Sequence, residues 1–295
     1  MILSSSDLDL GVPYEEHYIP TNGINLHVVQ AGPKDGPLLI LLHGFPEFWY
    51  GWKHQISYLA RAGYRVWAPD QRGYNLSDKP KEVSAYNLDY LSDDIMGLID
   101  AAGKEKAFIV GHDWGAGVAW WSANKYRERI ERMVILNVPH HAVMQQAVRS
   151  SFRQLQKSWY IFFFQLPRLA EALVRYNNWK MGIRALQNSS QPGTFSKTDL
   201  ELYRQAWSQP HAITGMINWY RAIVRQQPKS LPSPRIQVPT LMIWGTQDKF
   251  LGRELAAKSI ELCDDGRLVM IEEATHWVQH EQPERVNELI AEFLS

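Results

Sequence analysis

The sequence has one cysteine, no long hydrophobic run and no excess of charge of either sign, and each absence excludes a class of protein. Cys263 is the only cysteine among 295 residues, so no intrachain disulfide and no cysteine-based metal cluster is expected. Lys and Arg together number 31, as do Asp and Glu, and no basic run suggests a nucleic-acid partner. No stretch reaches the ~18 apolar residues of a membrane-spanning helix.

The bulk composition is that of an ordinary globular protein. Hydrophobic residues make up 45% of the chain and charged residues 21%. Residues 1–7 lack the basic and apolar stretches of a secretion signal. Together with the single cysteine, this predicts a cytoplasmic protein. The length fits either one large domain or a core that carries an insert.

Apolar runs that alternate with helical patterns predict an α/β fold. Residues 18–20 and 24–29 flank Asn22-Gly23 and predict a β-hairpin. Further strands are expected at residues 37–42, 64–69, 107–110 and 133–137, with helices near 52–60 and 89–101. The apolar runs are continuous, as in strands that are buried on both faces. This order predicts a mostly parallel, doubly wound sheet.

The alternation stops between residues 139 and 234, where the pattern is helical and prolines stand at both ends. Strand patterns resume at 238–245 and 267–271, and a last helix is expected at 283–293. We therefore predict a core domain made of residues 1–138 and 235–295. Residues 139–234 are predicted to form an inserted helical cap domain.

The segment Gly111-His112-Asp113-Trp114-Gly115 joins a predicted strand to a predicted helix. The spacing is that of a nucleophile elbow, in which glycines allow a sharp turn and the middle side chain projects from the sheet. Esterases have serine in the middle, and here the residue is Asp113, which argues against an ordinary esterase. A carboxylate is ionised at pH 7 and can attack a saturated carbon to form an alkyl ester.

Two further polar residues follow predicted strands at the same edge of the sheet. Asp248 comes after the strand at 238–245, and His276 comes after the strand at 267–271. The order nucleophile, acid, histidine is that of an α/β-hydrolase triad. The loop after the strand at 37–42 is where an oxyanion hole belongs, and we expect the backbone N–H groups of Phe45 and Trp114 to form it.

These motifs resemble those of the α/β-hydrolase-fold epoxide hydrolases of the soluble or bacterial type. The resemblance runs from residues 43–47 through 70–77 and 111–116 to His276, and so spans nearly the whole chain. Asn75 departs from the pattern, because the family often has glycine there. Asparagine tolerates positive φ better than most residues, so we expect the loop to be kept. The resemblance implies a hydrolase that needs no cofactor and no metal.

The family uses two cap tyrosines to hold the oxygen of an opening epoxide. The resemblance assigns this role to Tyr160 and Tyr220, and a phenol suits it because it is a neutral donor at pH 7. We expect Trp159, Phe164 and Trp219 to line an apolar substrate pocket. The expected partners are a small neutral lipophilic epoxide and water, and the protein is expected to be a monomer or a homodimer.

Other activities remain open at this point. Haloalkane dehalogenases share the Asp-Trp-Gly elbow, but many have an asparagine where this chain has Phe45. A fluoroacetate dehalogenase would need an arginine beside the nucleophile, and Trp114 and Gly117 supply no such charge. A non-catalytic binding protein of the same fold is the third reading. The presence of all three triad residues and both tyrosines argues against it.

Overall fold

The computed structural model describes residues 8–150, 152–226 and 233–295. The N-terminal segment 1–7, interpreted above as lacking a secretion signal, lies outside the described residues. So does part of the predicted helix breaker at 231–234. Within the described ranges no helix is both long enough and apolar enough to cross a membrane.

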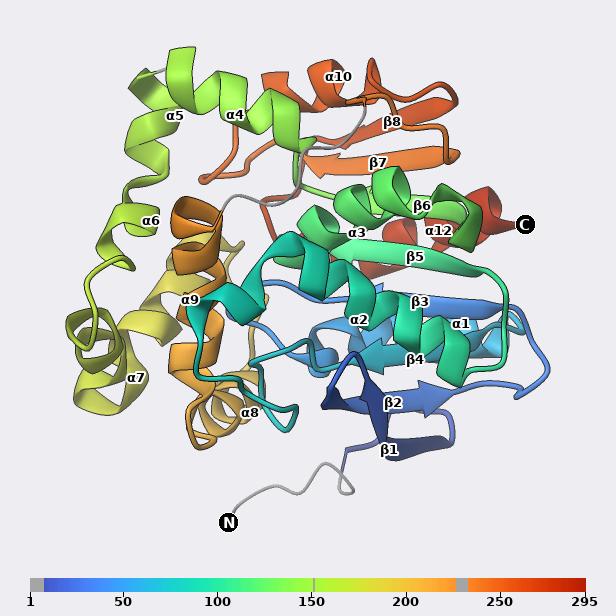
Figure 1. Ribbon diagram of the computed structural model, residues 1–295, viewed down its shortest axis with the longest axis horizontal. Coiled ribbons are helices and arrows are strands. Elements are labelled where there is room, and N and C mark those ends of the chain that lie inside the picture. Colours follow the sequence, from blue (N-terminus) through green and yellow to red (C-terminus); the bar gives the residue numbers. More distant parts are fainter. Residues whose placement is uncertain (1–7, 151, 227–232) are drawn as a thin grey trace.

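The described residues form one eight-stranded sheet in the order β1-β2-β4-β3-β5-β6-β7-β8 (Figure 1). β1 and β2 are antiparallel to their neighbours and the remaining pairs are parallel, as predicted. The strands are β1 (Tyr14–Thr21), β2 (Ile24–Ala31), β3 (Leu38–Leu42), β4 (Arg65–Pro69), β5 (Ala107–His112), β6 (Ile130–Leu136), β7 (Thr240–Gly245) and β8 (Gly266–Ile271).

Local sequence explains the ends and the middle of this sheet. Asn22 and Gly23 have φ of 44° and 76°, which a two-residue hairpin turn requires, so β1 and β2 pair as predicted. The central strands β3, β5 and β7 are buried along their whole length. Helices cover both faces of the sheet, so these strands have apolar residues on both sides.

The core helices lie on the two faces of the sheet (Figure 1). One face carries α1 packed against α12, and the other carries α2 packed against α3. The core helices are α1 (Lys53–Arg61), α2 (Leu88–Ala101), α3 (Trp114–Lys125), α10 (Glu254–Ile260), α11 (Val278–Glu281) and α12 (Pro283–Leu294), with short 3-10 turns at Trp49–Trp52, Val83–Tyr86 and Arg127–Arg129.

Helices joined by turns and loops make up the described part of the stretch between β6 and β7, and its only strand-like contact there is an isolated bridge between Ile236 and Cys263. It covers the sheet at the ends of the parallel strands, on the left-hand side of Figure 1. Its helices are α4 (His141–Ser150), α5 (Phe152–Lys157), α6 (Trp159–Phe163), α7 (Leu169–Ser189), α8 (Lys197–Trp207) and α9 (Ala212–Arg225). The backbone of α7 is interrupted from Tyr176 to Trp179, where φ and ψ are not helical. We call this stretch the cap.

The loop after β4 has a positive backbone angle at Asn75. The φ of Asn75 is 36°, in the region where glycine or asparagine is favoured. The Asn75 amide donates a 2.8 Å hydrogen bond to Asp70 Oδ2. Asparagine therefore adds a contact that glycine could not make.

Candidate active site

Asp113 stands between the end of β5 and the start of α3, in a strained backbone conformation. Its φ is 49° and its ψ is −124°. Gly111 and Gly115 are needed here because the backbone packs closely around them, and not because of their own φ values. A Cβ on Gly115 would overlap the carbonyl oxygen of Leu42, and one on Gly111 would crowd the backbone at Gly115. The glycines let β3, β5 and α3 approach closely, and the positive φ falls on the aspartate itself.

The loop after β3 contacts the Asp113 carboxylate directly. The backbone N–H of Phe45 donates a 2.7 Å hydrogen bond to Asp113 Oδ1. Gly44 is required beside it, because a Cβ there would overlap the Asp113 side chain. The expected donor at Phe45 therefore lies next to the carboxylate. The corresponding role of the Trp114 N–H stays a prediction.

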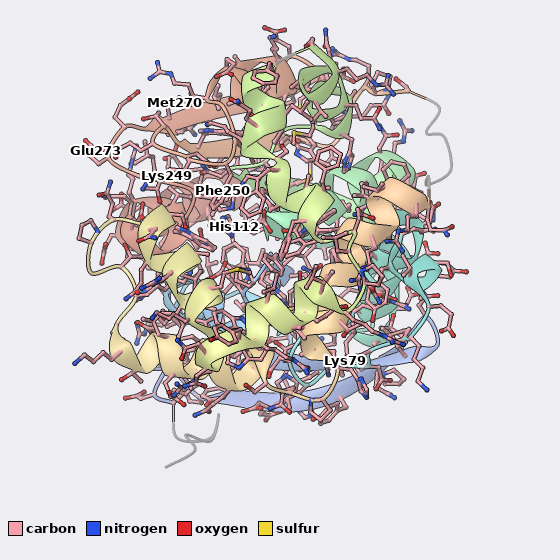
Figure 2. The ribbon with its side chains drawn as sticks, turned by 90° about the vertical axis from the view of Figure 1, so that its left-hand side faces the viewer. Lys79, His112, Lys249, Phe250, Met270 and Glu273 are labelled. Carbon is pink, nitrogen blue, oxygen red and sulfur yellow. The ribbon has the colours of Figure 1, made fainter. Side chains whose placement is uncertain are left out.

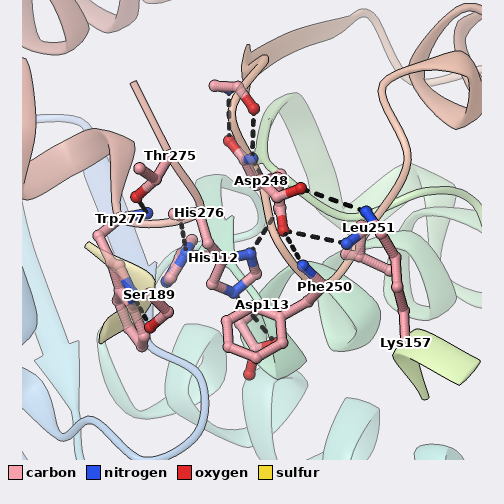
Figure 3. A network of polar contacts seen from close by, with 12 residues as sticks. His112, Asp113, Lys157, Ser189, Asp248, Phe250, Leu251, Thr275, His276 and Trp277 are labelled. Atoms are coloured by element: carbon pink, nitrogen blue, oxygen red, sulfur yellow. Dashed lines mark hydrogen bonds and ion pairs between the residues drawn. The ribbon is translucent and has the colours of Figure 1, made fainter. Parts of the chain in front are cut away.

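The three predicted triad residues lie together (Figure 3). His276 Nδ1 is 2.7 Å from Asp248 Oδ2, and His276 Nε2 is 3.5 Å from Asp113 Oδ2. Asp113 follows β5, Asp248 follows β7 and His276 follows β8. The carboxyl ends of parallel strands thus bring together residues that are far apart in the sequence.

Asp248 is held by more partners than the sequence analysis named. The backbone N–H groups of Phe250 and Leu251 donate to its Oδ1 at 2.7 and 3.0 Å. The Asn137 amide donates to its Oδ2 at 2.9 Å (Figure 3 shows the network around this carboxylate). The sequence contained a signal for Asn137, a polar residue that ends an apolar strand next to the elbow strand.

The carboxylates control the protonation of the histidine. Burial by itself lowers the pKa of His276, but the charge of Asp248 and the hydrogen bonds to Asp113 and Asp248 raise it to about 10. Burial likewise opposes ionisation of Asp113, yet the contacts with His276 and the Phe45 N–H hold its pKa below the usual value. At neutral pH the site therefore contains an imidazolium between two carboxylates.

Tyr160 from α6 and Tyr220 from α9 approach Asp113 from the cap side. Their rings meet edge to face with centroids 5.7 Å apart, and both line the same cavity as Asp113 and His276. Burial raises the pKa of both phenols, and the negative charge of Asp113 raises it further. Both hydroxyls are consequently neutral donors over the whole physiological pH range.

The cavity in front of these groups has a volume of about 200 Å³ and a largely apolar wall. Trp159 and Phe164 line it, as expected. Phe163, from the same aromatic segment, lines it as well. Sequence reasoning missed the rest of the wall, which is dominated by apolar residues of both the cap and the core: Val174, Trp179, Met181, Leu186, Trp207, Ile213, Met216, Phe250, Leu251 and Trp277. Nothing in the local sequence distinguishes these residues from ordinary core positions.

Trp219 is not among the residues that line the cavity, and the structure corrects its predicted place. The side chain is 1% exposed, and its Nε1 donates a 2.9 Å hydrogen bond to the carbonyl of Arg72. Its ring packs edge to face against Tyr74 and Trp114. Successive residues on a helix point about 100° apart, so Trp219 faces the core when Tyr220 faces the cavity.

A buried carboxylate lies directly behind the triad. Glu47 is 1% exposed and accepts hydrogen bonds from Tyr203 of α8 at 2.7 Å and from His280 of α11 at 2.6 Å. The His112 ring links it to the triad, with Nδ1 3.1 Å from Glu47 and Nε2 2.8 Å from the carbonyl of His276. Burial opposes the charge, but His280 and His112 hold the pKa of Glu47 well below its usual value.

Metal ligands do not gather anywhere in the described ranges. No three His, Cys, Asp or Glu side chains among them are placed so as to hold a metal ion.

Comparison with known proteins gives the class first. The profile of the α/β hydrolase fold family matches residues 37–283. The chain is 49% identical over 277 residues to YfhM of Bacillus subtilis, which is described as an AB hydrolase superfamily protein. The match covers 94% of this chain and 96% of YfhM. Like its relatives, this chain belongs to the α/β-hydrolase family.

Within that family, the similarity is to epoxide hydrolases. Epoxide hydrolase 1 of Caenorhabditis elegans is 40% identical over 290 residues, with 96% of this chain and 70% of that protein covered. The crystal structure of Bacillus megaterium epoxide hydrolase in complex with an inhibitor superimposes with a TM-score of 0.86. Its sequence is 30% identical, and the match covers 94% of this chain and 99% of that chain.

Proposed function

We propose that this protein is an epoxide hydrolase that converts lipophilic epoxides into vicinal diols through a covalent ester on Asp113. One observation carries the proposal. A nucleophilic carboxylate, a histidine and two neutral phenols face one apolar cavity, formed by Asp113, His276, Tyr160 and Tyr220. A haloalkane dehalogenase would share the carboxylate and the histidine, but it has no use for the paired phenols.

The first step opens the epoxide ring. The Asp113 carboxylate attacks one ring carbon and the carbon–oxygen bond breaks. Tyr160 and Tyr220 donate hydrogen bonds to the departing oxygen, which becomes a hydroxyl by taking the proton that the His276 imidazolium gives up as the ester forms. The Phe45 N–H already holds Oδ1 at 2.7 Å, so Oδ2, which lies nearer His276, is the attacking oxygen. Oδ1 then becomes the carbonyl oxygen of the ester.

The second step hydrolyses the ester. His276, oriented by Asp248, removes a proton from water, and the water oxygen attacks the ester carbonyl. The N–H groups of Phe45 and Trp114 stabilise the negative charge on Oδ1 in the tetrahedral intermediate. The intermediate collapses and the leaving alkoxide takes the proton from His276 to become the diol. The new carboxylic acid passes its remaining proton to His276, which restores the Asp113 carboxylate and the imidazolium.

The charge of Asp113 couples the two steps. In the free enzyme that charge contributes to the raised pKa of His276, about 10, which keeps the imidazole protonated and unable to act as a base. Ester formation removes one of the two carboxylates, so the pKa of His276 falls towards neutrality. His276 therefore becomes a base after the ester has formed, when a base is needed.

The test is diol formation from styrene oxide, followed by chromatography, beside halide release from a bromoalkane of similar size. We expect the purified protein to form phenylethanediol and to release no bromide. Bromide release without diol would establish a dehalogenase instead. Absence of both products, with thermal stabilisation by styrene oxide, would establish a binding protein.

Removing the two phenols should mainly slow ring opening. Tyr160→Phe and Tyr220→Phe each delete one hydrogen bond to the developing oxyanion, so each is expected to lower the rate of ester formation about a hundredfold. The double variant should lose more than either single one. The rate is measured by stopped-flow tryptophan fluorescence under single-turnover conditions. Tyr176→Phe, at an exposed position of the cap, is the matched control. Equal rates of ester formation in the two single variants, the double variant and the control would contradict the role assigned to Tyr160 and Tyr220.

The proposal also keeps the other expectations from the sequence. The protein works in the cytoplasm as a monomer or homodimer, with an epoxide and water as its only reactants and no cofactor. Residues 139–234 act as a cap domain over a core of residues 1–138 and 235–295. Trp159 and Phe164 contact the substrate.

A further inference from the structure

The zero net charge of this protein hides a strong separation of charge. Residues 139–234, the cap region, contain 12 Lys and Arg but only 3 Asp and Glu. Because the whole chain has 31 of each kind, the core carries the opposite excess. All three cap acids are engaged, since Glu171 pairs with Arg221, Asp199 with Lys53 and Glu201 with Arg204. The outer face of the cap is therefore left with cations.

The exposed cations of α7 and of the residue just before it illustrate this excess. Arg168, Arg175, Lys180 and Arg184 are exposed, and none of them forms an ion pair with a described residue. Lys180 and Arg184 are four residues apart in the second half of α7, so they lie on the same side of the helix.

The same part of the cap exposes large apolar side chains. Seven lie between residues 159 and 181, on α6, the loop after it and α7: Trp159, Phe162, Leu166, Leu169, Leu173, Tyr176 and Met181. Trp159 is 61% exposed, Phe162 57% and Tyr176 74%. Leu169 and Leu173 are four residues apart, so they lie on one side of α7, and exposed apolar side chains grouped in this way mark an interaction surface. We call the seven side chains the cap apolar surface.

The cap apolar surface adjoins the mouth of the active-site cavity. Trp159 and Met181 are exposed and also line the cavity, so at these two residues the cavity wall continues into the outer surface. Figure 2 faces this side of the molecule, with the cap helices in front and Phe250 visible behind them. A substrate that enters at this point passes exposed apolar side chains before it reaches Asp113.

We propose that the cap apolar surface docks the enzyme on an anionic lipid surface, so that lipophilic epoxides enter the cavity from the membrane. Cations around exposed tryptophan, phenylalanine and leucine are the composition of a segment that lies in the lipid interface. The cations add attraction to anionic head groups. The docking inference rests on the proposed function only in taking the substrate to be a lipophilic epoxide.

The charge argues against the other occupants of this surface. A second copy of the chain docked cap to cap would bring two cationic surfaces together, which costs energy through like-charge repulsion. A nucleic acid would use the cations but would leave most of the aliphatic side chains, such as Leu169 and Leu173, without a partner. A lipid interface engages both kinds of residue at once.

The test is flotation of the full-length protein with vesicles, without any epoxide. We expect binding to vesicles of phosphatidylglycerol and phosphatidylcholine in equal parts, and little binding to phosphatidylcholine alone. Lys180→Gln with Arg184→Gln should weaken binding about thirtyfold, the size expected for two cations at an anionic surface. The matched control is Lys81→Gln with Lys106→Gln, two exposed cations of the core.

A second pair of variants tests the apolar part. Leu169→Ser with Leu173→Ser should also weaken binding at least tenfold, whereas Tyr18→Ser with Tyr58→Ser, at exposed core positions, should not. None of these residues lines the cavity, so hydrolysis of dissolved styrene oxide without vesicles should be unchanged in every variant.

The outcomes separate this inference from the proposed function. Absence of vesicle binding, or equal losses in the cap and core variants, would overturn the docking surface even if the protein forms diol. Binding lost only in the cation variants would mean purely electrostatic adsorption and would also overturn it. Vesicle binding by a protein that forms no diol would support the docking surface and refute the proposed epoxide hydrolase activity.

Discussion

The Asp113→Asn variant is expected to form no diol and no covalent adduct. An amide is neutral and is a poor nucleophile, so ring opening loses its attacking group, and turnover should fall by at least about a thousandfold. The measurement is diol release from styrene oxide, together with the intact mass of the protein after incubation with substrate. Diol formation at a tenth of the normal rate or more would show that another group attacks the epoxide.

The same variant also tests the electrostatics of the site. Because the charge of Asp113 helps to raise the pKa of His276 to about 10, its removal should lower that pKa. The imidazole then loses its proton at a lower pH, which an NMR titration of the ring can follow. Trp114→Phe, which keeps the carboxylate, should leave the pKa of His276 where it is. An unchanged pKa in Asp113→Asn would mean that Asp248 alone controls the histidine.

The His276→Gln variant should form the ester but fail to hydrolyse it. Glutamine cannot take a proton from water, so the second step slows by about a thousandfold or more, while Asp113 can still attack. Intact-mass analysis should then show a protein heavier by one molecule of epoxide, with a single burst of substrate consumption. Peptide mapping should place the added mass on Asp113.

The pH dependence of kcat also tests whether His276 acts as the base. In the wild type, hydrolysis needs a neutral imidazole in the ester state, so kcat should rise with pH through a pKa well below the value of about 10 in the free enzyme. Burial and the charge of Asp113 raise the pKa of both phenols, so no loss is expected between pH 7 and 9. Normal turnover by His276→Gln, or a kcat that falls between pH 7 and 9, would refute the assignment of His276 as the general base.

The elements of the sheet and the position of the triad could be predicted because their signals are local. An apolar run followed by a polar residue marks the end of a buried parallel strand, and Asp113, Asp248 and His276 all stand at such ends. The same logic indicated the loop at Phe45. Parallel strands carry these ends to a common edge of the sheet, so local patterns were enough to predict that these three side chains lie together.

The cavity wall could not be predicted in the same way, because it depends on how the cap helices rotate and pack. Trp179 and Trp219 are both cap tryptophans, and only Trp179 lines the cavity. The backbone break from Tyr176 to Trp179 has no clear counterpart in the sequence pattern. Glu47 was read only as part of a loop motif, since its partners come from segments more than 60 residues away.

Glu47 has a consequence for exchanging caps between related enzymes. Its carboxylate accepts hydrogen bonds from core histidines and from Tyr203 in the cap. A chimaera that carries a foreign cap must therefore bring a hydroxyl donor to the place of Tyr203, even if its own substrate pocket is complete. Without that donor, a buried anion that His112 links to the backbone of His276 loses one of its contacts. Whether a foreign cap suits this core therefore depends on whether it places a hydroxyl donor where Tyr203 stands.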